Sequence, residues 1–499
     1  MAKRTDSPGP GLGSLGSAAL TAASLLVVSG FAAVIGVVIA REFGRTDETD
    51  GFFAAYGVFV VIITASQAIR VAVLPPLARA RDEGRLAGTT AGFATALAVI
   101  GTPLVLVALF AADPLAAVLT GGGTEAAQDA CAEALAWIVP ASVCHLFVGL
   151  CASALAALDD YATPALGYAV ASAAGLTLIV ARVDEDGIAA VSWGMALSAA
   201  VALAIPLAML AWRAGRTSMP ASAARPTGSP LHRRLGLFVA AAAIPLALQL
   251  AYVVSLPFAG RLGSGAVTSF GYAYLAATTL VGVTAFSIGL VSSVPLSRIG
   301  LDREATTRHV VAGVWVALAI IGAAVGVLAF AGADLVEAVL GDAYGDDVGE
   351  EVAGLIVLFS AWMVVAVGVN VTFPLTFVAR RFRALPWIGL AALVAQVGVA
   401  WIGSELLDLD GLALSLAVST ALVLALLLSQ LGALAPAARG IVVAAAVVAA
   451  LTCAAFVPPG LLLGGVASAL VGLGLYGALA AVIRPRGLTE SWAYLRALR

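Results

Sequence analysis

The stretch SPGPGLGSLGSAALTAASLLVVSGFAAVIGVVIA, residues 7–40, contains no charged side chain. A transmembrane helix needs about 20 mostly apolar residues, so this stretch is long enough to cross a bilayer. It is longer than the apolar core of a signal peptide, and no small-residue cleavage site followed by a soluble domain comes after it. We therefore expect a retained helix at 17–40. Similar apolar blocks follow along the chain, which predicts a polytopic membrane protein.

The composition indicates the same class of protein. Hydrophobic residues make up 62% of the 499 residues and charged residues only 11%, whereas roughly a quarter of a soluble domain is charged. The formal net charge is −3 and the basic residues are scattered, so the chain lacks the basic field that nucleic acid requires. The four cysteines, Cys131, Cys144, Cys151 and Cys453, lie in or beside apolar blocks without metal-ligand spacing, and we interpret them as small packing residues.

Charge-bounded apolar blocks of spanning length can be counted directly, and there are fourteen. We expect spans at 17–40, 51–69, 88–112, 134–157, 164–181, 188–212, 235–259, 266–296, 309–333, 352–379, 385–403, 411–434, 440–457 and 461–483. The block at 266–296 is long enough to tilt or to extend past the membrane. The predicted fold is an all-α polytopic membrane protein with about fourteen transmembrane helices.

The loops between these spans alternate in charge. Cytoplasmic loops collect Lys and Arg, while exported loops do not. The basic segments are Lys3/Arg4, 70–85, 213–234, 298–308, Arg380/Arg381/Arg383, Arg439 and 484–499, and all fall on one side. The acidic loops are Asp47/Glu48/Asp50, 113–129, 184–186, 334–351 and 405–410, on the other side. This pattern predicts a multi-pass protein of the bacterial inner membrane with both termini in the cytoplasm; the acidic pair Asp159–Asp160 departs from it.

Two sequence motifs recur at nearly the same offset. Leu74–Arg79 closes the second span and Val294–Arg298 closes the eighth, and their shared leucines, 77 and 296, are 219 residues apart. Tyr161–Pro164 opens the fifth span and Arg383–Pro386 opens the eleventh, with the shared prolines 222 residues apart. Because six spans is an even number, the repeats share one orientation, and transporters commonly bind substrate between such repeats. We expect two parallel six-helix repeats plus two extra C-terminal helices.

The predicted organisation follows from this repeat. It comprises a cytoplasmic tail (1–16), an N-lobe (17–212), a cytoplasmic linker (213–234), a C-lobe (235–434), helices 13 and 14 (440–483) and a C-terminal cytoplasmic tail (484–499). The linker is rich in Pro, Ser and Arg, which is typical of a flexible tether. Its basic residues could also contact anionic lipid headgroups.

Several of these segments resemble a known family. In the first half they are Arg41–Gly44, Thr49–Tyr56, Ile69–Arg70 and Pro76–Arg79; in the second they are Gly263–Thr268, Tyr272–Ala273 and Ser287–Gly289 through Pro295–Ser297. They resemble the lipid II flippase (MurJ/MviN-like) family of the multidrug/oligosaccharidyl-lipid/polysaccharide exporter superfamily, over spans 1–12. The resemblance implies a fourteen-helix transporter whose last two helices are extra and offer a groove for the lipid tail.

Charged residues inside the predicted spans are sparse. Members of the resembled family carry arginines in spans 1, 2 and 8 that face a central cavity and meet the lipid pyrophosphate. Here span 1 has no cation before Arg41, span 2 has none before Arg70, and span 8 has Leu275 and Thr278 in the region where charges are expected. The predicted cavity is therefore nearly uncharged, which leaves the identity of the cargo open.

Seven polar residues in or near the spans are our candidates for the substrate cavity. They are Arg41, Asp50, Gln67, Arg70, His145, Gln249 and Asn370. A charge at membrane depth is costly, so each one that is present is a functional candidate. Arg41 and Arg70 lie at span ends. There a long arginine side chain either extends its guanidinium to the membrane interface, or it lines the mouth of the cavity and binds a phosphate through two parallel hydrogen bonds. The amides bond between helices as readily as to a ligand.

Each remaining candidate has a structural alternative. His145, well within the fourth span, is either a titrating group or one partner of an interhelical hydrogen bond. Glu133 opens the same span, about 18 Å away along the helix, so the two cannot pair directly. The simplest interpretation of Asp50 is that it caps a helix. Gly263 and Gly265 predict a turn rather than a phosphate cradle, because no Gly-x-Gly-x-x-Gly pattern opens a helix there.

The chain carries no recognisable catalytic set, metal pattern or Gly-Lys-Ser/Thr phosphate loop. We predict a flippase, not an enzyme, that exports a polyprenyl-linked saccharide or peptidoglycan precursor by alternating access. The alternatives are a cation-coupled drug or metabolite antiporter of the same superfamily and a non-transporting membrane scaffold in cell-wall synthesis. No cofactor is expected, while a coupling ion, H+ or Na+, stays open. Expected partners are the lipid-linked precursor, membrane lipids and cell-wall synthesis proteins, and no nucleic acid.

Overall fold

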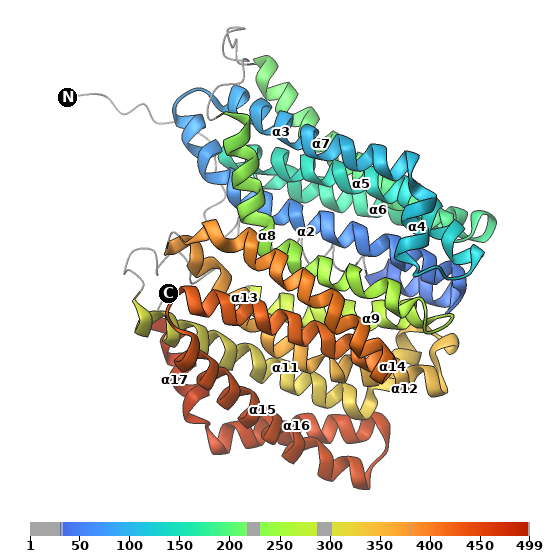
Figure 1. Cartoon of the computed structure of the whole chain (residues 1–499), viewed down its shortest axis with the longest axis vertical. Helices are drawn as coiled ribbons and strands as arrows, with labels where there is room; N and C mark the ends of the chain where they lie inside the picture. Colours follow the sequence, from blue (N-terminus) through green and yellow to red (C-terminus); the bar gives the residue numbers. More distant parts are fainter. Residues whose placement is uncertain (1–29, 31–32, 217–229, 287–301, 380, 498–499) are drawn as a thin grey trace. The chain divides into compact units, whose positions relative to one another are not determined.

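The structure is a computed structural model that describes residues 30, 33–216, 230–286, 302–379 and 381–497. Within these residues the chain is helical throughout, without a β-strand (Figure 1). Several predicted features lie outside the described residues. They are most of the first span and the tail before it, the middle of the linker, the second copy of the Leu74–Arg79 motif at 294–298, and the family-like segment 287–289. The described part of the first helix covers residues 33–43.

The first half of the sequence forms long helices that match the predicted apolar blocks. They are α2 (Asp47–Asp82), α3 (Leu86–Phe110), the short α4 (Ala112–Leu119), α5 (Glu125–Ala157), α6 (Ala162–Asp186) and α7 (Ala189–Arg216). Acidic residues occupy the first turn of α2, and Arg79 and Arg81 occupy its last turn. Both charges oppose the partial charge of the helix end at which they lie, which stabilises this 36-residue helix.

The second half continues the same architecture. Its helices are α8 (Leu231–Ala259), α9 (Ala266–Val281), the π-turn η2 (Gly282–Phe286), α11 (Arg303–Leu340), the 3-10 turn η3 (Asp342–Tyr344), α12 (Asp346–Leu358), α13 (Ser360–Val378), the 3-10 turn η4 (Phe382–Ala384), α14 (Leu385–Gln430), α15 (Leu434–Leu462), α16 (Gly465–Ile483) and α17 (Arg486–Ala497). α12 and α13 share one predicted span. The amphipathic helix α17 falls where we expected only a tail.

Twelve helices in the described part of the chain are long and apolar enough to cross a membrane. Our count of fourteen differs for two reasons. The first predicted span lies mostly outside the described residues. In addition, α14 contains two predicted spans, because Leu407 and Asp408 have non-helical backbone angles in its interior. The all-helical polytopic class is confirmed, and fourteen stays an approximate number.

The two parts of α14 fold back on each other at this break. A Cβ atom placed on Gly403 would lie 2.5 Å from the Gly411 carbonyl oxygen, so the two backbones touch. Further along, the Gln396 amide donates hydrogen bonds to the hydroxyls of Ser255 and Ser415, both at 2.9 Å. Gln396 is fully buried. The predicted spans 385–403 and 411–434 are therefore two segments joined by a tight turn.

The chain divides into two compact units that do not follow the two sequence halves. Unit 1 contains 1–36, 62–111 and 133–241, and unit 2 contains 37–61, 112–132 and 242–499. α2 and α5 thus contribute residues to both units. Unit 2 joins the second half of the sequence to two segments of the first half.

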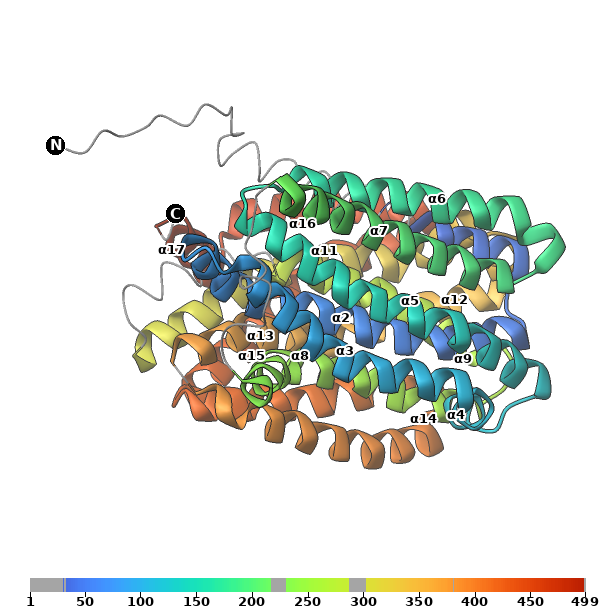
Figure 2. The same ribbon diagram turned by 90° about the horizontal axis from the view of Figure 1, so that it is seen from above.

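Small residues bring the helices of unit 1 into close contact. α6 and α7 run side by side (Figure 2), and a Cβ on Gly175 would lie 2.6 Å from the Gly194 carbonyl oxygen. Val148, Ala171 and Ala202 form a buried cluster next to this pair. Packing through Gly and Ala is the usual way in which membrane helices associate, because lipid gives no hydrophobic driving force between them.

The acidic pair Asp159–Asp160, which departed from the charge pattern, is neutralised within unit 1. Arg81 at the end of α2 pairs with Asp159 at 2.7 Å, and Arg213 at the end of α7 pairs with Asp160 at 2.5 Å. Both arginines belong to segments predicted to be cytoplasmic. The acidic loop therefore lies at the same end of unit 1 as those basic segments.

In unit 2 the C-terminal helices α15 and α16 pack on α11 (Figure 1). Phe456 and Tyr476 lie in a buried cluster between them, and the Tyr476 hydroxyl donates to the Ala319 carbonyl at 2.8 Å. Gly326 and Gly472 make room for the Phe456 ring, because a Cβ on either would lie within 2.4 Å of it. The two extra helices are thus attached to the second half through α11.

Candidate functional site

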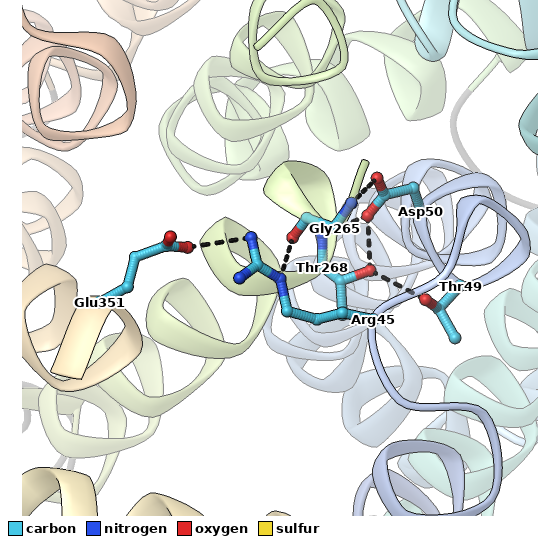
Figure 3. A network of polar contacts seen from close by, with 6 residues as sticks. All are labelled: Arg45, Thr49, Asp50, Gly265, Thr268 and Glu351. Carbon is cyan, nitrogen blue, oxygen red and sulfur yellow. Dashed lines mark hydrogen bonds and ion pairs between the residues drawn. The ribbon is translucent and has the colours of Figure 1, made fainter. Parts of the chain in front are cut away.

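A polar network connects the start of α2 to the start of α9 within unit 2. Its members are Arg45, Thr49, Asp50, Gly265, Thr268 and Glu351, here called the cap network (Figure 3). The first three belong to the first half of the sequence and the last three to the second half. The network therefore joins segments more than 200 residues apart along the chain.

The start of α9 supplies hydrogen-bond donors without a local acceptor. Its N-cap residue, Gly265, has a φ of +80° and no side chain to accept from the first turn. Asp50 takes that role: its carboxylate accepts from the Gly265 N–H at 2.6 Å, the Thr268 N–H at 2.8 Å and the Thr268 hydroxyl at 2.6 Å. Asp50 is 6% exposed. A buried carboxylate is tolerated when its oxygens are bonded in this way, and the helix dipole adds to the attraction.

The capping role predicted for Asp50 thus applies to α9 rather than to its own helix. The start of α2 is capped by Thr46 and Thr49, whose side-chain oxygens accept from each other's backbone N–H at 2.8 and 3.3 Å. This reciprocal arrangement resembles a capping box. The Thr49 hydroxyl also accepts from the Thr268 hydroxyl at 3.3 Å.

Arg45 holds the opposite face of Gly265. Its Nε donates to the Gly265 carbonyl at 3.1 Å, and its terminal nitrogen pairs with Glu351 on α12 at 3.2 Å. A Cβ on Gly265 would lie 2.4 Å from the Arg45 Nε. Glycine is therefore required at 265 both for the positive φ and for the close approach of the arginine. The prediction that Gly263 and Gly265 form a turn is confirmed by their φ angles of +133° and +80°.

Two further contacts hold residues 41–44 against the second half. The Arg41 guanidinium donates to the carbonyls of Ala338 and Val339 at 2.9 and 3.3 Å, in the last turn of α11. These carbonyls have no partner within the helix, and a cation there also complements the dipole. The buried Tyr344 hydroxyl donates to the Gly44 carbonyl at 3.1 Å. Arg41 therefore caps a helix end in this structure.

Aromatic rings pack directly behind the cap network. The rings of Phe53 and Tyr272 are 4.8 Å apart, and those of Tyr252 and Tyr274 stack at 4.1 Å. A Cβ on Gly57 would lie 2.7 Å from Leu256. This dense aromatic layer packs α2, α8 and α9 together.

The turn after α4 makes a second contact between the two sequence halves in unit 2. A Cβ on Gly121 would lie 2.0 Å from the Pro257 carbonyl oxygen, and one on Gly260 would lie 2.1 Å from the Thr120 carbonyl oxygen. The two backbones are thus in direct contact. The cap network and this turn together fasten 37–61 and 112–132 to the second half.

Two predicted residues, Arg70 and His145, come together in unit 1. The ring of His145 lies parallel to that of Tyr168 with 6.5 Å between centroids, and Arg70 is close enough to Tyr168 to interact electrostatically. The Ser66 hydroxyl donates to the His145 carbonyl at 2.8 Å. A Cβ on Gly149 would lie 3.1 Å from the Arg70 Cγ, so the stem of the arginine crosses α5 at this glycine.

The three predicted amides do not form one group. Gln249 on α8 accepts a hydrogen bond from the Tyr274 hydroxyl at 2.8 Å. Asn370 on α13 donates to the Ala366 carbonyl of its own helix at 2.8 Å. Gln67 lies on α2, and its side chain is outside what the structure describes. Gln249 therefore makes the interhelical bond that was the structural alternative.

Of the six residues of the cap network, sequence reasoning chose only Asp50 as a candidate. It missed Arg45, Thr49, Gly265, Thr268 and Glu351. Gly263–Thr268 was noted as a motif, but not as the partner of Asp50. A signal was present, because a glycine N-cap before an apolar helix leaves donors that need an acceptor from elsewhere. No feature of the sequence says which acceptor it is.

The all-helical architecture and the twelve apolar helices found within the described residues define a multi-pass inner-membrane protein. Residues 39–475 match the family model of the lipid II flippase MurJ, and the chain belongs to that family. No curated protein matches the sequence.

Solved structures share the fold at low sequence identity. A lipid II flippase MurJ in an inward closed conformation superposes with a TM-score of 0.70 at 13% identity, covering 94% of this chain and 99% of that one. A eukaryotic MATE transporter, AtDTX14, gives 0.59 at 16% identity, covering 87% and 97%. A transporter of the multidrug/oligosaccharidyl-lipid/polysaccharide superfamily from Pyrococcus furiosus gives 0.57 at 15% identity, covering 89% and 99%.

Proposed function

We propose that this protein is a flippase that moves a lipid-linked peptidoglycan precursor across the inner membrane by alternating access. The family match over 39–475 carries this assignment. The cap network would act as the gate at the extracytoplasmic face, with both termini in the cytoplasm. The assignment of the face rests on the charge pattern of the loops.

The gate is built from bonds that join the two halves of the sequence and that transport must break. Asp50 accepts three hydrogen bonds from the start of α9, while Arg41 and Arg45 donate to carbonyls of the second half. Hydrogen bonds to charged groups contribute about 1.5–3 kcal/mol each. A few such bonds hold one state closed and still allow a cargo with differential affinity to shift the equilibrium.

Acidic residues surround the proposed exit. A pocket of about 620 Å³ is lined by Glu350, Glu351 and Asp410, and another of the same volume by Asp334, Glu337, Asp342 and Arg41. The acidic loops predicted to be exported thus meet at this end of unit 2. A negative field at the exit would favour release of an anionic pyrophosphate cargo. An inside-negative potential adds about 2.3 kcal/mol per charge per 100 mV to its outward movement.

Arg70 is the proposed phosphate contact in the first half. Its stem lies at Gly149 of α5 and its charge acts on Tyr168 of α6, where a planar fork could meet a phosphate. Arg70→Ala is expected to lower the rate of transport at least tenfold, while expression and folding stay the same as in the wild type. Unchanged transport would refute this role.

The function is tested by replacing the flippase of a bacterium with this protein and locating the precursor. We expect that depletion leaves the lipid-linked precursor facing the cytoplasm and that expression of the wild-type chain restores its export. Normal precursor topology with drug hypersensitivity would instead indicate an antiporter. A chain that restores cell-wall synthesis without exporting the precursor would instead indicate a scaffold.

A further inference from the structure

A pocket of about 540 Å³ lies between the first turns of α11, the first turns of α15 and the C-terminal helix α17. Figure 1 shows α17 beside α11 and α15 in unit 2. The family match ends at residue 475, before α17 begins at Arg486. The pocket is therefore completed by a helix outside the family match, and it lies apart from the cap network.

Two glycines let the three helices meet closely enough to form this pocket. A Cβ on Gly440 of α15 would lie 2.4 Å from Val311 of α11, and one on Gly487 of α17 would lie 2.4 Å from the Trp315 ring. Ser491, 5% exposed, faces the same contact. The pocket walls are thus set by direct packing of α17 on α11.

The pocket lies where the apolar surface gives way to charged residues. α11 carries Arg303, Glu304 and Arg308 in its first two turns and has no charged residue from Val310 to Ala333. On α17, Trp492 is 50% exposed and stacks with the Arg496 guanidinium at 5.2 Å. Exposed Trp and Arg on an amphipathic helix are typical of a helix that lies at the membrane–water boundary. The pocket therefore opens at the level of the lipid headgroups.

The pocket lining carries one charge of each sign, Arg308 and Glu490. Burial raises the pKa of the Tyr494 phenol and the Arg308 charge opposes that rise, so the guanidinium lies near this ring. Arg308 also pairs with Glu304 at 2.7 Å, but both side chains are more than 60% exposed, so a phosphate could replace Glu304 at low cost. Trp315 and Tyr494 supply apolar walls.

We propose that this pocket binds the headgroup of a zwitterionic aminophospholipid from the adjacent leaflet. Arg308 would hold the phosphate, and Glu490 would hold the ammonium group. The aromatic rings would contact the glycerol end of the acyl chains. A headgroup that carries only negative charge satisfies Arg308 and is repelled by Glu490, so the pair of charges selects the zwitterion.

Native mass spectrometry of the full-length protein tests this site. The protein is equilibrated with nanodiscs of equal phosphatidylethanolamine and phosphatidylglycerol, and the retained lipids are counted. We expect the wild type to retain phosphatidylethanolamine in preference. Arg308→Gln should lower retention of both lipids by about threefold to tenfold, and Glu490→Gln should lower only the phosphatidylethanolamine preference.

Two variants complete the experiment. Arg303→Gln removes an exposed cation of the same helix that does not line the pocket, and it should behave as the wild type. Thr307→Trp fills the pocket from a half-buried lining position and should displace the lipid without disturbing the buried contacts. The proposal would be overturned if the wild type retained the two lipids equally. It would also be overturned if the Glu490→Gln protein showed the same lipid preference as the Arg303→Gln protein.

Discussion

The Asp50 carboxylate accepts three hydrogen bonds from Gly265 and Thr268, and its position at the start of α9 makes it the most sensitive residue of the proposed gate. Asp50→Asn keeps an oxygen acceptor but loses the charge, so the closed state should lose about 1.5–3 kcal/mol. That loss corresponds to roughly a tenfold to hundredfold rise in opening. Labelling of Ser269→Cys, at a buried position on α9, by an impermeant maleimide measures the opening in a background without native cysteines.

Glu48→Gln is the matched control for this substitution. Glu48 belongs to the same first turn of α2 but is exposed, so its loss removes a helix-end charge without touching α9. We expect labelling of this variant to equal that of the wild type within twofold. Equal labelling of the Asp50→Asn and Glu48→Gln proteins would show that the carboxylate does not hold the gate.

The ion pair between Arg45 and Glu351 should contribute less than the Asp50 cap. Their side chains are 19% and 39% exposed, so water and salt screen the attraction. A double-mutant cycle of Arg45→Gln and Glu351→Gln is expected to give a coupling of about 0.5–1 kcal/mol. Arg45→Gln alone should cost more than Glu351→Gln alone, because Arg45 also donates to the Gly265 carbonyl. Thermal unfolding in low and high salt measures the coupling and the cost of each single substitution. A coupling energy that grows with salt would contradict the assignment of a screened ion pair.

At the scale of a single element, the turn inside α14 depends on two glycines. A Cβ on Gly411 would lie 1.9 Å from the Gly403 carbonyl oxygen, so the two backbones must separate if alanine replaces it. We expect Gly411→Ala to lower the melting temperature by several degrees, because close-packed backbone contacts relax poorly. Gly398→Ala, in the same helix with open space around the position, should be neutral or slightly stabilising. Similar melting temperatures for the two variants would show that the turn tolerates a side chain.

The positions of the helices were predictable because lipid imposes a length and an apolar composition on each span. The Tyr161–Pro164 and Arg383–Pro386 motifs do open helices, since α6 begins at Ala162 and α14 at Leu385. Helix ends were less predictable: α11 continues to Leu340, seven residues past its predicted span. α17 was not predicted as a helix, because an amphipathic helix at the membrane surface lacks the apolar length on which the count relied.

At the scale of the whole molecule, the site was less predictable than the fold. Asp50 was chosen because an acid at the start of a membrane span is informative by itself. Its partners were not found, because Gly265 and Thr268 lie 215 and 218 residues away and only folding brings them together. Tyr344, which bonds to Gly44 across 300 residues, gave no signal for the same reason. Local pattern therefore identifies which groups need partners, and tertiary contacts decide which partners they receive.

If alternating access requires the cap network to open, a covalent bond across it should stop transport. The hydroxyls of Thr49 and Thr268 are 3.3 Å apart, so cysteines at these positions bring their sulfur atoms close enough for a disulfide to be tested. In a background without native cysteines, the Thr49→Cys/Thr268→Cys protein should lose at least tenfold in precursor export when oxidised and recover it on reduction. Each single cysteine variant controls for the substitution itself and should transport equally in both redox states. Full export by the oxidised, cross-linked protein would mean that these two segments stay together throughout the cycle and that the gate lies elsewhere.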